Sequence, residues 1–517
     1  MQRRSFLLGA TGLCLAAPAG ALGPAYPFGL GVASGSPLPD AVVLWTRILP
    51  DPLEARSAGA LALSVRWEVA HDAGFSRLAA KGSALAHPDL AHSVHVDVRG
   101  LAPGRWYWYR FMLGDAVSPV GRTRTAPAPD SLPDLLKMAV ASCQHWEFGS
   151  YAAHRHIAAA APDLVAFLGD YIYEWGPYSL RHPARAQRVD ESFTLDQYRA
   201  RYAQYKSDPD LQAAHLAAPW IVTWDDHEVA NDYARDSDER RAPDFAARRA
   251  AAYQAFYEHM PVRLDVPRTR AFGEMRIHQR YDWGQLARLH VLDDRQYRST
   301  HACGPKERGG SSSITRACRA LADPRRTMLG TAQEAWLTEG LRTSRARWNF
   351  LAQQTPMAQA TQVPLGAAGA AGAGRFWSDG WDGYPAARAR LFADLVASKA
   401  ANPVVLAGDV HTFYASDLQR DFDRPSSKRN PVIATELCGS SVTSSSRPQA
   451  RTQQYVEMNP HIRYGRSDRR GFMLLEVRPR TMSAMFVGLD DVHDARSGVS
   501  TLASFEVADG VAGVRRR

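Results

Sequence analysis

Residues 164–175 of this 517-residue chain read LVAFLGDYIYEW, and the interpretation of the sequence starts from this stretch. An apolar run, Leu164 to Leu168, reaches Gly169 and then Asp170, and Tyr173 follows three positions later. A short apolar run bounded by a turn residue predicts a strand that is covered on both faces, as in α/β folds. Sites in such folds gather beyond the carboxyl ends of the strands. The stretch therefore predicts a buried strand that ends with a carboxylate and a phenol.

The same arrangement recurs after three other apolar runs. The run LLKMAVASCQH carries Cys143, PWIVTWDDHEVAND carries Asp225, Asp226, His227 and Asn231, and PVVLAGDVHTF carries Asp409 and His411. A single Asp after a strand is often a helix cap or a turn former. Four strand ends that all carry metal-binding side chains, two of them introduced by Gly-Asp, instead indicate one shared metal site.

The ligand types indicate two kinds of cation. A phenol has a pKa of about 10, so a phenolate at neutral pH needs a strongly Lewis-acidic partner. A set of thiolate, phenolate, carboxylate and imidazole favours iron, in its ferric state, over Mg²⁺ or Ca²⁺. Zinc is compatible with Cys and His but seldom binds Tyr. The remaining carboxylates form an oxygen-rich second position, which suits Ca²⁺ and, less well, Mn²⁺ or Mg²⁺.

Two cations that share a carboxylate can bind a phosphate ester and stabilise the charge of an in-line displacement. His227 lies between acids at the same rim, where it would donate to phosphate oxygens or protonate the leaving alkoxide. The alternative is a histidine that only orients its neighbours. The predicted catalytic residues are His227, Asp226 and Asp170.

A second charged motif, DDRQYRST, contributes Arg295 and Arg298. Both arginines are predicted to hold substrate phosphate bidentately. Ion pairing with Asp293 and Asp294 is an equally good interpretation.

The pattern of the chain changes near residue 130. Residues 27–127 contain short alternating runs such as AVVLWTRI, LSVRWEVA and WYWYRFML, which predict a small antiparallel β-sandwich. The Pro-rich stretch TAPAPDSLP (125–133) is typical of a domain boundary. From 134 to 485, apolar runs alternate with helical stretches such as DQYRARYAQYK, which predicts an α/β domain with covered sheets.

The first 21 residues predict an export signal. Arg3 and Arg4 precede an apolar stretch and small residues suited to cleavage, which is the twin-arginine form of signal. A plain membrane anchor is the alternative, but small residues dilute the segment, and no other run is long enough to span a bilayer. We expect a periplasmic or secreted protein whose partner during export is the twin-arginine translocon.

The cysteines and the net charge give further predictions about the environment and the partners of the protein. In an exported, oxidising environment Cys303 and Cys318, which bracket a Gly/Ser-rich stretch, predict a disulfide. Cys438 is expected to be a small buried apolar residue. Apolar residues at 45% and charged residues at 22% are ordinary globular values. The net charge of +9 suits an anionic substrate, but no basic arm indicates a nucleic-acid partner.

These residues carry a family resemblance. The series GDYIY, WDDHE and GDVH is similar to the calcineurin-like metallophosphoesterase signature GDxxY, GNH[DE] and GHxH. Asp226 stands in place of the Asn, Asp409 replaces the first His, and Cys143 takes a position usually held by Asp. These departures resemble the PhoD-type alkaline phosphatases, which include phospholipase D-like members. Stretches that agree with this family run from about residue 27 to 480, among them LDDRQYR, RWNFLAQQ and NPHIRYGRSDRRGF.

The resemblance implies a four-layer α/β/β/α catalytic domain after an N-terminal β-sandwich, with one Fe³⁺, two Ca²⁺ and alkaline hydrolysis of phosphomonoesters or diesters. Carried over by position, the iron ligands are Cys143, Asp170, Tyr173 and His411. The calcium ligands are Asp170, Asp226 and Asp409, while Asp225 and Asn231 are assigned to the second calcium from position alone.

Three functional hypotheses remain at this stage. The first is an exported phosphomonoesterase that also cleaves diesters, and the second is a phospholipase D-like phosphodiesterase. The third is an exported phosphate- or metal-binding protein without catalysis. Substrates of the first two classes would be small phosphate esters, or phospholipid and nucleotide diesters.

Overall fold

The structure is a computed structural model that describes residues 26–49, 59–178, 183–264, 271–364 and 374–517. The predicted export signal at residues 1–21 lies outside the described residues. Among those that are described, no helix combines the length and the apolar character that a membrane span requires.

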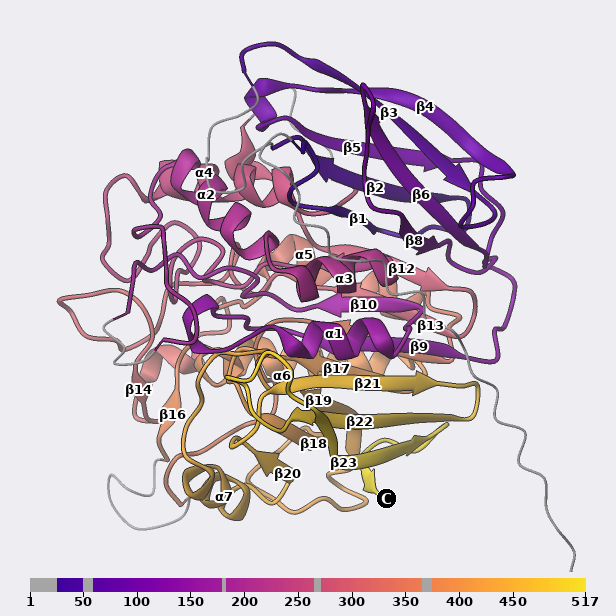
Figure 1. Cartoon of the computed structure of the whole chain (residues 1–517). Coiled ribbons are helices and arrows are strands. Elements are labelled where there is room, and N and C mark those ends of the chain that lie inside the picture. Colours follow the sequence, from indigo (N-terminus) through magenta and orange to yellow (C-terminus); the bar gives the residue numbers. More distant parts are fainter. Residues whose placement is uncertain (1–25, 50–58, 179–182, 265–270, 365–373) are drawn as a thin grey trace, which may run out of the picture.

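Two large sheets face each other at the centre of the molecule (Figure 1). The ten-stranded sheet contains, in spatial order, β24 (Arg515–Arg516), β23 (Val499–Ala508), β22 (Thr481–Leu489), β21 (Gly471–Val477), β9 (Leu136–Ala141), β10 (Leu164–Phe167), β11 (Trp220–Val222), β1 (Val32–Gly35), β2 (Ala41–Arg47) and β5 (Ser93–Arg99). The seven-stranded sheet contains β12 (Gln279–Trp283), β13 (Ala287–Val291), β15 (Trp348–Ala352), β17 (Pro403–Ala407), β19 (Val432–Cys438), β18 (Phe413–Gln419) and β20 (Ile462–Arg466). Buried side chains from both sheets, such as Met138 and Phe350, form one apolar core between them.

Helices cover the outer face of each sheet. The ten-stranded sheet is covered by α1 (Ala152–Ala159), α2 (Leu195–Lys206), α3 (Pro209–Ala217) and α4 (Phe245–His259), and the seven-stranded sheet by α5 (Gly330–Arg342) and α6 (Pro385–Ser398). The four-layer α/β/β/α architecture expected from the resemblance is therefore confirmed. A further helix, α7 (Gln449–Met458), packs beside β20 at the lower left of Figure 1.

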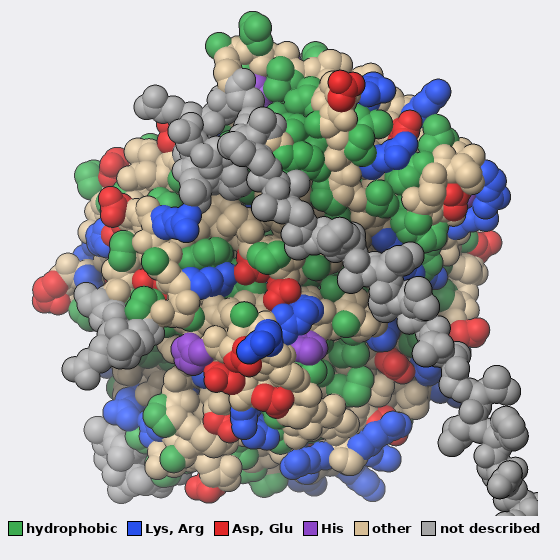
Figure 2. Space-filling model, in the orientation of Figure 1, with side chains coloured by type: hydrophobic (Ala, Val, Ile, Leu, Met, Phe, Trp, Pro, Cys, Tyr) green, Lys and Arg blue, Asp and Glu red, His purple; other side chains and the backbone are tan. Residues whose placement is uncertain are grey.

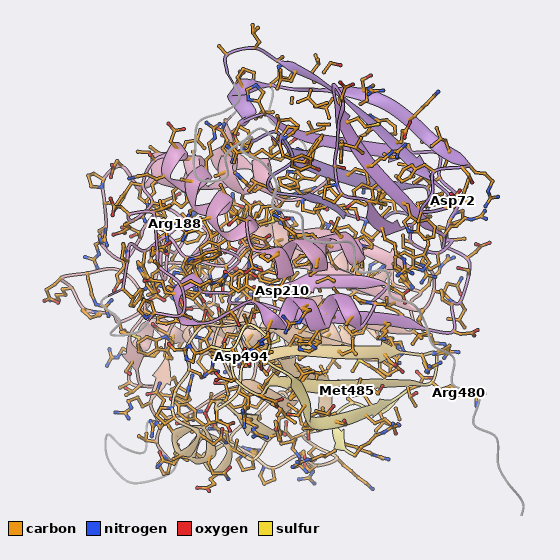
Figure 3. All side chains as sticks on the ribbon, viewed as in Figure 1. Asp72, Arg188, Asp210, Arg480, Met485 and Asp494 are labelled. Atoms are coloured by element: carbon orange, nitrogen blue, oxygen red, sulfur yellow. A yellow bond between two sulfur atoms is a disulfide. The ribbon has the colours of Figure 1, made fainter. Side chains whose placement is uncertain are left out.

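Local sequence explains where several helices begin. Thr194 and Gln197 form a reciprocal capping box at the start of α2. At α3, Asp208 accepts a hydrogen bond from the backbone N–H of Leu211 at 3.0 Å, and Pro209 occupies the first turn. An ion pair between Arg155 of α1 and Asp210 of α3, 3.0 Å long, then ties the two helices together; Asp210 is labelled in Figure 3.

The N-terminal region forms the expected β-sandwich. Its outer sheet contains β4 (Leu78–Ala86), β3 (Leu63–Ala70), β6 (Trp106–Leu113), β7 (Ala116–Val117) and β8 (Gly121–Arg124). The other sheet consists of β1, β2 and β5, which continue the catalytic sheet through one parallel pairing, Gly35 with Trp220. The sequence did not indicate this continuity. The domain limits at 27–127 and 134–485 stay a prediction.

The disulfide expected between Cys303 and Cys318 is present, with the two Cα atoms 6.1 Å apart. Its loop contains β14 (Ser313–Ile314), which pairs with β16 (Phe376–Trp377). Cys438 is fully buried, as expected. Figure 2 shows basic and acidic side chains interspersed over the face in view, so the net positive charge is not gathered into one patch there.

The buried Lys206 contacts both the N-terminal strands and the catalytic strands of the ten-stranded sheet. The Nζ atom of Lys206 on α2 lies 4.2 Å from the ring centre of Trp45 on β2 and 3.3 Å from the Tyr171 hydroxyl. Burial lowers the pKa of Lys206 from 10.5 to about 7. Between these values the unfolded chain holds a proton that the folded chain lacks. The free-energy cost of burying Lys206 in its charged form is therefore fully present below pH 7, and it decreases to zero as the pH rises toward 10.5.

We expect Lys206→Met to raise the free energy of unfolding by on the order of 3 kcal/mol near neutral pH, because the apolar side chain needs no deprotonation. The gain should shrink toward zero near pH 10.5. Chemical denaturation at both pH values measures it, with the exposed Lys428→Met as the matched control. An equal gain at both pH values would contradict this account.

Candidate metal centre

The ends of four strands bring the predicted ligands together. Cys143 follows β9, Asp170 and Tyr173 follow β10, Asp225 and Asp226 follow β11, and Asp409 and His411 follow β17. Ligand atoms of Cys143, Asp170 and His411 all lie within 4.8 Å of one another. The same holds for Asp225, Asp226 and Asp409, and for Asp170, Asp226 and His227. Asp170 and Asp226 each belong to more than one group, so the groups form one continuous cluster.

Unusual backbone conformations shape these strand ends. Cys143, Asp170, Asp409 and His411 have φ angles of 61°, 54°, 63° and 54°, in the left-handed region that non-glycine residues seldom adopt. Such conformations persist where surrounding structure enforces them, often at functional sites. Gly169 has a φ of 103°, and a Cβ atom there would lie 2.5 Å from the Cβ of Asp225. Glycine at this position allows the ends of β10 and β11 to approach.

The phenol of Tyr173 is the hub of the first group. It donates a hydrogen bond to Asp170 Oδ2 at 2.8 Å and lies 3.2 Å from His411 Nε2. His411 Nδ1 lies 2.6 Å from the carbonyl oxygen of Ser445, so it must carry the proton. The Nε2 lone pair of His411 is thereby left free to bind a cation. Ser444 Oγ lies 2.7 Å from the phenol oxygen and 2.9 Å from the Cys143 carbonyl oxygen.

The electrostatics of this group fit a strong Lewis acid. Burial raises the pKa of the Cys143 thiol and of the Tyr173 phenol, and the charge of Asp170 raises both further. Burial also pushes the pKa of Asp170 upward, but the charge of His227 and the hydrogen bond donated by Tyr173 help to outweigh it, and the pKa is lowered. Asp170 Oδ1 is buried and has no hydrogen-bond partner in the described part of the chain. A cation bound there would satisfy this oxygen and stabilise the thiolate and the phenolate.

A second set of acids surrounds the buried guanidinium of Arg295. Its Nη1 donates to both carboxylate oxygens of Asp379, at 2.8 and 2.7 Å, its Nη2 donates to Asp409 at 2.9 Å, and its Nε donates to Asp225. Burial still raises the pKa of Asp225 and Asp409 well above their usual value, despite the opposing charge of Arg295. Asp225 Oδ2 is another buried oxygen without a hydrogen-bond partner among the described residues. This oxygen-rich cluster fits hard cations such as Ca²⁺.

The two arginines predicted to bind substrate have other partners. Arg298 donates to the carbonyl oxygen of Asp379 at 2.8 Å and to its carboxylate at 3.0 Å. Both Arg295 and Arg298 are fully buried, and neither lines the cavity described below. The structure gives direct phosphate binding no support, and that role stays a prediction. Ion pairing does occur, but the partners are not Asp293 and Asp294.

His227 is held by a carboxylate that the sequence interpretation missed. Its Nδ1 lies 2.7 Å from Glu174 Oε2, while Glu174 Oε1 accepts a hydrogen bond from the backbone N–H of Asn231 at 2.7 Å. Burial opposes the charged imidazolium, but Glu174 and Asp226 outweigh it and raise the pKa of His227. Glu174 lies in the opening stretch LVAFLGDYIYEW, so its position beside Tyr173 was the available signal.

Two further acids join the cluster without having been predicted. Asp226, Asp232 and Asp379 offer carboxylate oxygens within 4.8 Å of one another. Asp232 accepts hydrogen bonds from the backbone N–H and the Oγ of Ser311, at 3.0 and 2.5 Å, and Ser311 belongs to the disulfide-closed loop. Asp232 directly follows Asn231 and could have been included, whereas Asp379 follows the two-residue strand β16, which gives no recognisable pattern.

The cluster opens into a cavity of about 780 Å³. Its lining includes Asp170, Tyr173, Asp226, His227, Asn231, Asp409 and His411. Aromatic side chains of Trp175, Tyr178 and Trp377 also line it. A cavity of this size that is lined by both metal-binding acids and aromatic side chains suits a substrate with a charged group and a bulkier substituent.

Comparison with known proteins agrees with this geometry. The family model of PhoD-like phosphatase matches residues 138–486, and the model of its N-terminal domain matches residues 15–127. The chain belongs to the PhoD-like phosphatase family. It is 42% identical to alkaline phosphatase D of Bacillus subtilis (strain 168) over 538 aligned positions, which cover 100% of this chain and 89% of the relative. A solved structure described as "Structure of PhoD" superposes with a TM-score of 0.88 at 42% identity, covering 97% of this chain and 93% of the other.

Membership of this family makes the protein a phosphoric ester hydrolase. The PhoD-like family assignment also confirms the fold expected from the resemblance. The hypothesis of a phosphate-binding protein without catalysis is set aside on the same ground.

In this PhoD-like phosphatase, the Glu228 side chain connects the ends of β10 and β11. Its carboxylate accepts backbone N–H groups of Asp170, Tyr171 and Asp225 at 3.1, 2.6 and 2.7 Å. We expect Glu228→Ala to lower the free energy of unfolding by roughly 3 kcal/mol or more, because three buried donors lose their acceptor. Chemical denaturation measures this loss.

The matched control is Glu307→Ala at an exposed position, which should change stability by less than about 0.5 kcal/mol. Glu228→Gln keeps an acceptor oxygen and should recover part of the loss. Equal stability of Glu228→Ala and the native protein would contradict the stabilising role of these three hydrogen bonds.

Proposed function

We propose that this protein is an exported, metal-dependent alkaline phosphatase that hydrolyses phosphomonoesters and also diesters at a centre of one Fe³⁺ and two Ca²⁺. The observation that carries the proposal is the meeting of a buried thiol, a phenol and an imidazole nitrogen at one carboxylate, Asp170. Sulfur and phenol oxygen select iron over Mg²⁺ or Ca²⁺. The neighbouring set consists only of oxygen donors and suits calcium.

The proposed ligands follow from the groups of side chains. Cys143, Asp170, Tyr173 and His411 would hold iron, and Asp170, Asp226 and Asp409 would hold one calcium. For the second calcium, Asp225 and Asn231 remain the sequence-based candidates. Asp232 and Asp379 join them because both approach Asp226.

When bound, the cations would supply Lewis acidity to the phosphate group and lower the pKa of the attacking water. The protein's own part is to position groups around the ester. Glu174 fixes the imidazole of His227 through Nδ1, so that Nε2 is the nitrogen available to the substrate. From this rim His227 would donate a proton to the leaving oxygen, and Asp170 and Asp226 would hold the metal positions.

Export is proposed from the sequence alone. Arg3 and Arg4 precede the apolar stretch of a twin-arginine signal, and this pathway carries proteins that are already folded. The disulfide between Cys303 and Cys318 supports an oxidising destination, periplasmic or extracellular.

A phospholipase D-like phosphodiesterase is the second candidate. The observation that favours it is the apolar part of the cavity lining, which includes Pro356, Ala358, Ala360 and Ile462. The protein loaded with iron and excess Ca²⁺ should be assayed on p-nitrophenyl phosphate, on bis(p-nitrophenyl) phosphate and on phosphatidylcholine. Faster turnover of phosphatidylcholine than of either nitrophenyl ester would favour the second candidate.

We expect Cys143→Ala and Tyr173→Phe to lose iron and activity together, because each removes one of the donors that select the metal. Activity on p-nitrophenyl phosphate should fall at least about 100-fold, since even supporting residues of metal sites contribute 10–100-fold. Elemental analysis of the purified variants measures iron and calcium per chain.

Cys438→Ala is the matched control, because it removes a buried thiol that belongs to none of the possible ligand groups in the described chain. This variant should retain its iron. A Cys143→Ala protein that is both active and iron-replete would refute the ligand assignment.

A further inference from the structure

The serine-rich stretch SSVTSSS (440–446) connects the metal centre to a basic part of the cavity wall. Its Ser445 carbonyl accepts the Nδ1 proton of His411, and its Ser446 hydroxyl lies 3.0 Å from that of Thr412. Arg447 follows immediately, and consecutive Cα atoms are about 3.8 Å apart. The sequence therefore places a guanidinium group one residue beyond a loop that is anchored to the proposed iron site.

Two arginines share one aromatic support in this part of the cavity wall. The guanidinium carbons of Arg447 and Arg451 lie 4.8 and 5.0 Å from the ring centre of Tyr455, which is buried. Both arginines and the tyrosine line the same cavity as Asp170 and His411. Stacking on an aromatic ring orients a guanidinium without consuming its N–H donors.

Neither arginine is neutralised by an acid. Across the residues with described positions, no carboxylate oxygen lies within 4.0 Å of the charged nitrogens of Arg447 or Arg451. Arg451 donates to the side chain of Gln454 at 2.9 Å and to the carbonyl oxygen of Gln362 at 3.5 Å, which leaves further donors available. Helix α7 carries no acid in its first turn, so the positive end of its dipole adds to the same field.

A buried hydroxyl group in the cavity wall without a hydrogen-bond partner points to a ligand. Ser416 is buried, lines the cavity, and its hydroxyl has no hydrogen-bond partner in the described part of the protein. Glu436 lies in the same wall, but its two carboxylate oxygens accept the backbone N–H groups of Met357 and Ala358. Burial raises the pKa of Glu436 to about 7, so at alkaline pH it is a carboxylate whose two oxygens are already occupied by these N–H donors. The cavity wall thus combines an acidic, metal-binding cluster with a pair of arginines.

We propose that Arg447 and Arg451 form a second anion subsite, which binds a second phosphate group of the substrate while the first is hydrolysed at the metal centre. The enzyme would then prefer esters that carry two phosphate groups over simple phosphomonoesters. This inference rests on the phosphate-ester hydrolysis proposed above. Arginine suits the task because its planar fork binds phosphate oxygens bidentately.

The test uses inhibitors that the enzyme cannot cleave. Alkane diphosphonates with chains of increasing length, and alkyl monophosphonates of matched length, compete with p-nitrophenyl phosphate on the iron- and calcium-loaded enzyme. We expect one chain length at which the diphosphonate binds roughly tenfold or more tightly than its monophosphonate, as an added charged hydrogen-bond pair allows. Excess Ca²⁺ in every assay prevents the diphosphonates from acting by removing metal.

Variants assign the preference to this subsite. In Arg447→Ala, and more strongly in the double variant Arg447→Ala/Arg451→Ala, the ratio of the two inhibition constants should fall toward one. Arg447→Lys keeps the charge and should keep part of the ratio. Arg429→Ala is the matched control, because this exposed arginine lines a separate cavity of about 470 Å³, and it should leave the ratio unchanged.

An unchanged ratio in the double variant, or no preference for any diphosphonate in the native enzyme, would overturn the subsite. Failure of the proposed function would look different, because the native, metal-loaded protein would then not hydrolyse p-nitrophenyl phosphate at all. A circular dichroism spectrum and a melting temperature like those of the native protein show that each variant is folded. If the double variant fails to fold, Arg447→Ala alone decides the question.

Discussion

The mutual repulsion of buried carboxylates is the constraint on which the rest of this structure depends. Asp170, Asp225 and Asp226 are buried and Asp409 is partly buried where they meet at the ends of apolar strands, so water screens their charges much less than at the surface. Burial raises the pKa of Asp225, Asp226 and Asp409, and their mutual repulsion raises it further, because Arg295 compensates only part of the charge. Cations are the natural complement of such a cluster, and the left-handed turns at the strand ends hold the acids in place to receive them.

Much of this site could be predicted because its parts follow strong local patterns. An apolar run that ends in Gly-Asp, as at β10 and β17, announces both a buried strand and the ligand beyond it. Other parts have no local signature. Asp379 follows a strand of only two residues, and the partners of Arg295 are 70, 84 and 114 positions away along the chain. Such contacts depend on tertiary packing, which a pattern of neighbouring residues does not encode.

The family resemblance supplied what the residues alone left open. Residue types alone favoured iron over zinc at one position, whereas the expectation of two calcium ions came from the matched motifs. The serine-rich stretch carried no predicted role, because hydroxyl groups occur in many loops. Its importance appears only when the chain folds, since Ser444 then contacts the phenol of Tyr173 and Ser445 orients His411. One loop thereby sets the geometry of two proposed ligands and also positions Arg447.

The ten-stranded sheet is continuous between β1 and β11 through a very short pairing. Only Gly35 pairs with Trp220 across it, and a methyl group at position 35 would lie 2.3 Å from the Pro261 carbonyl oxygen and 2.6 Å from that of Trp220. Both carbonyl groups belong to the main chain, so they cannot move away by a change of side-chain rotamer. The pairing that continues the catalytic sheet into the N-terminal sandwich therefore requires glycine at position 35, because any other residue would bring a carbon atom against main chain.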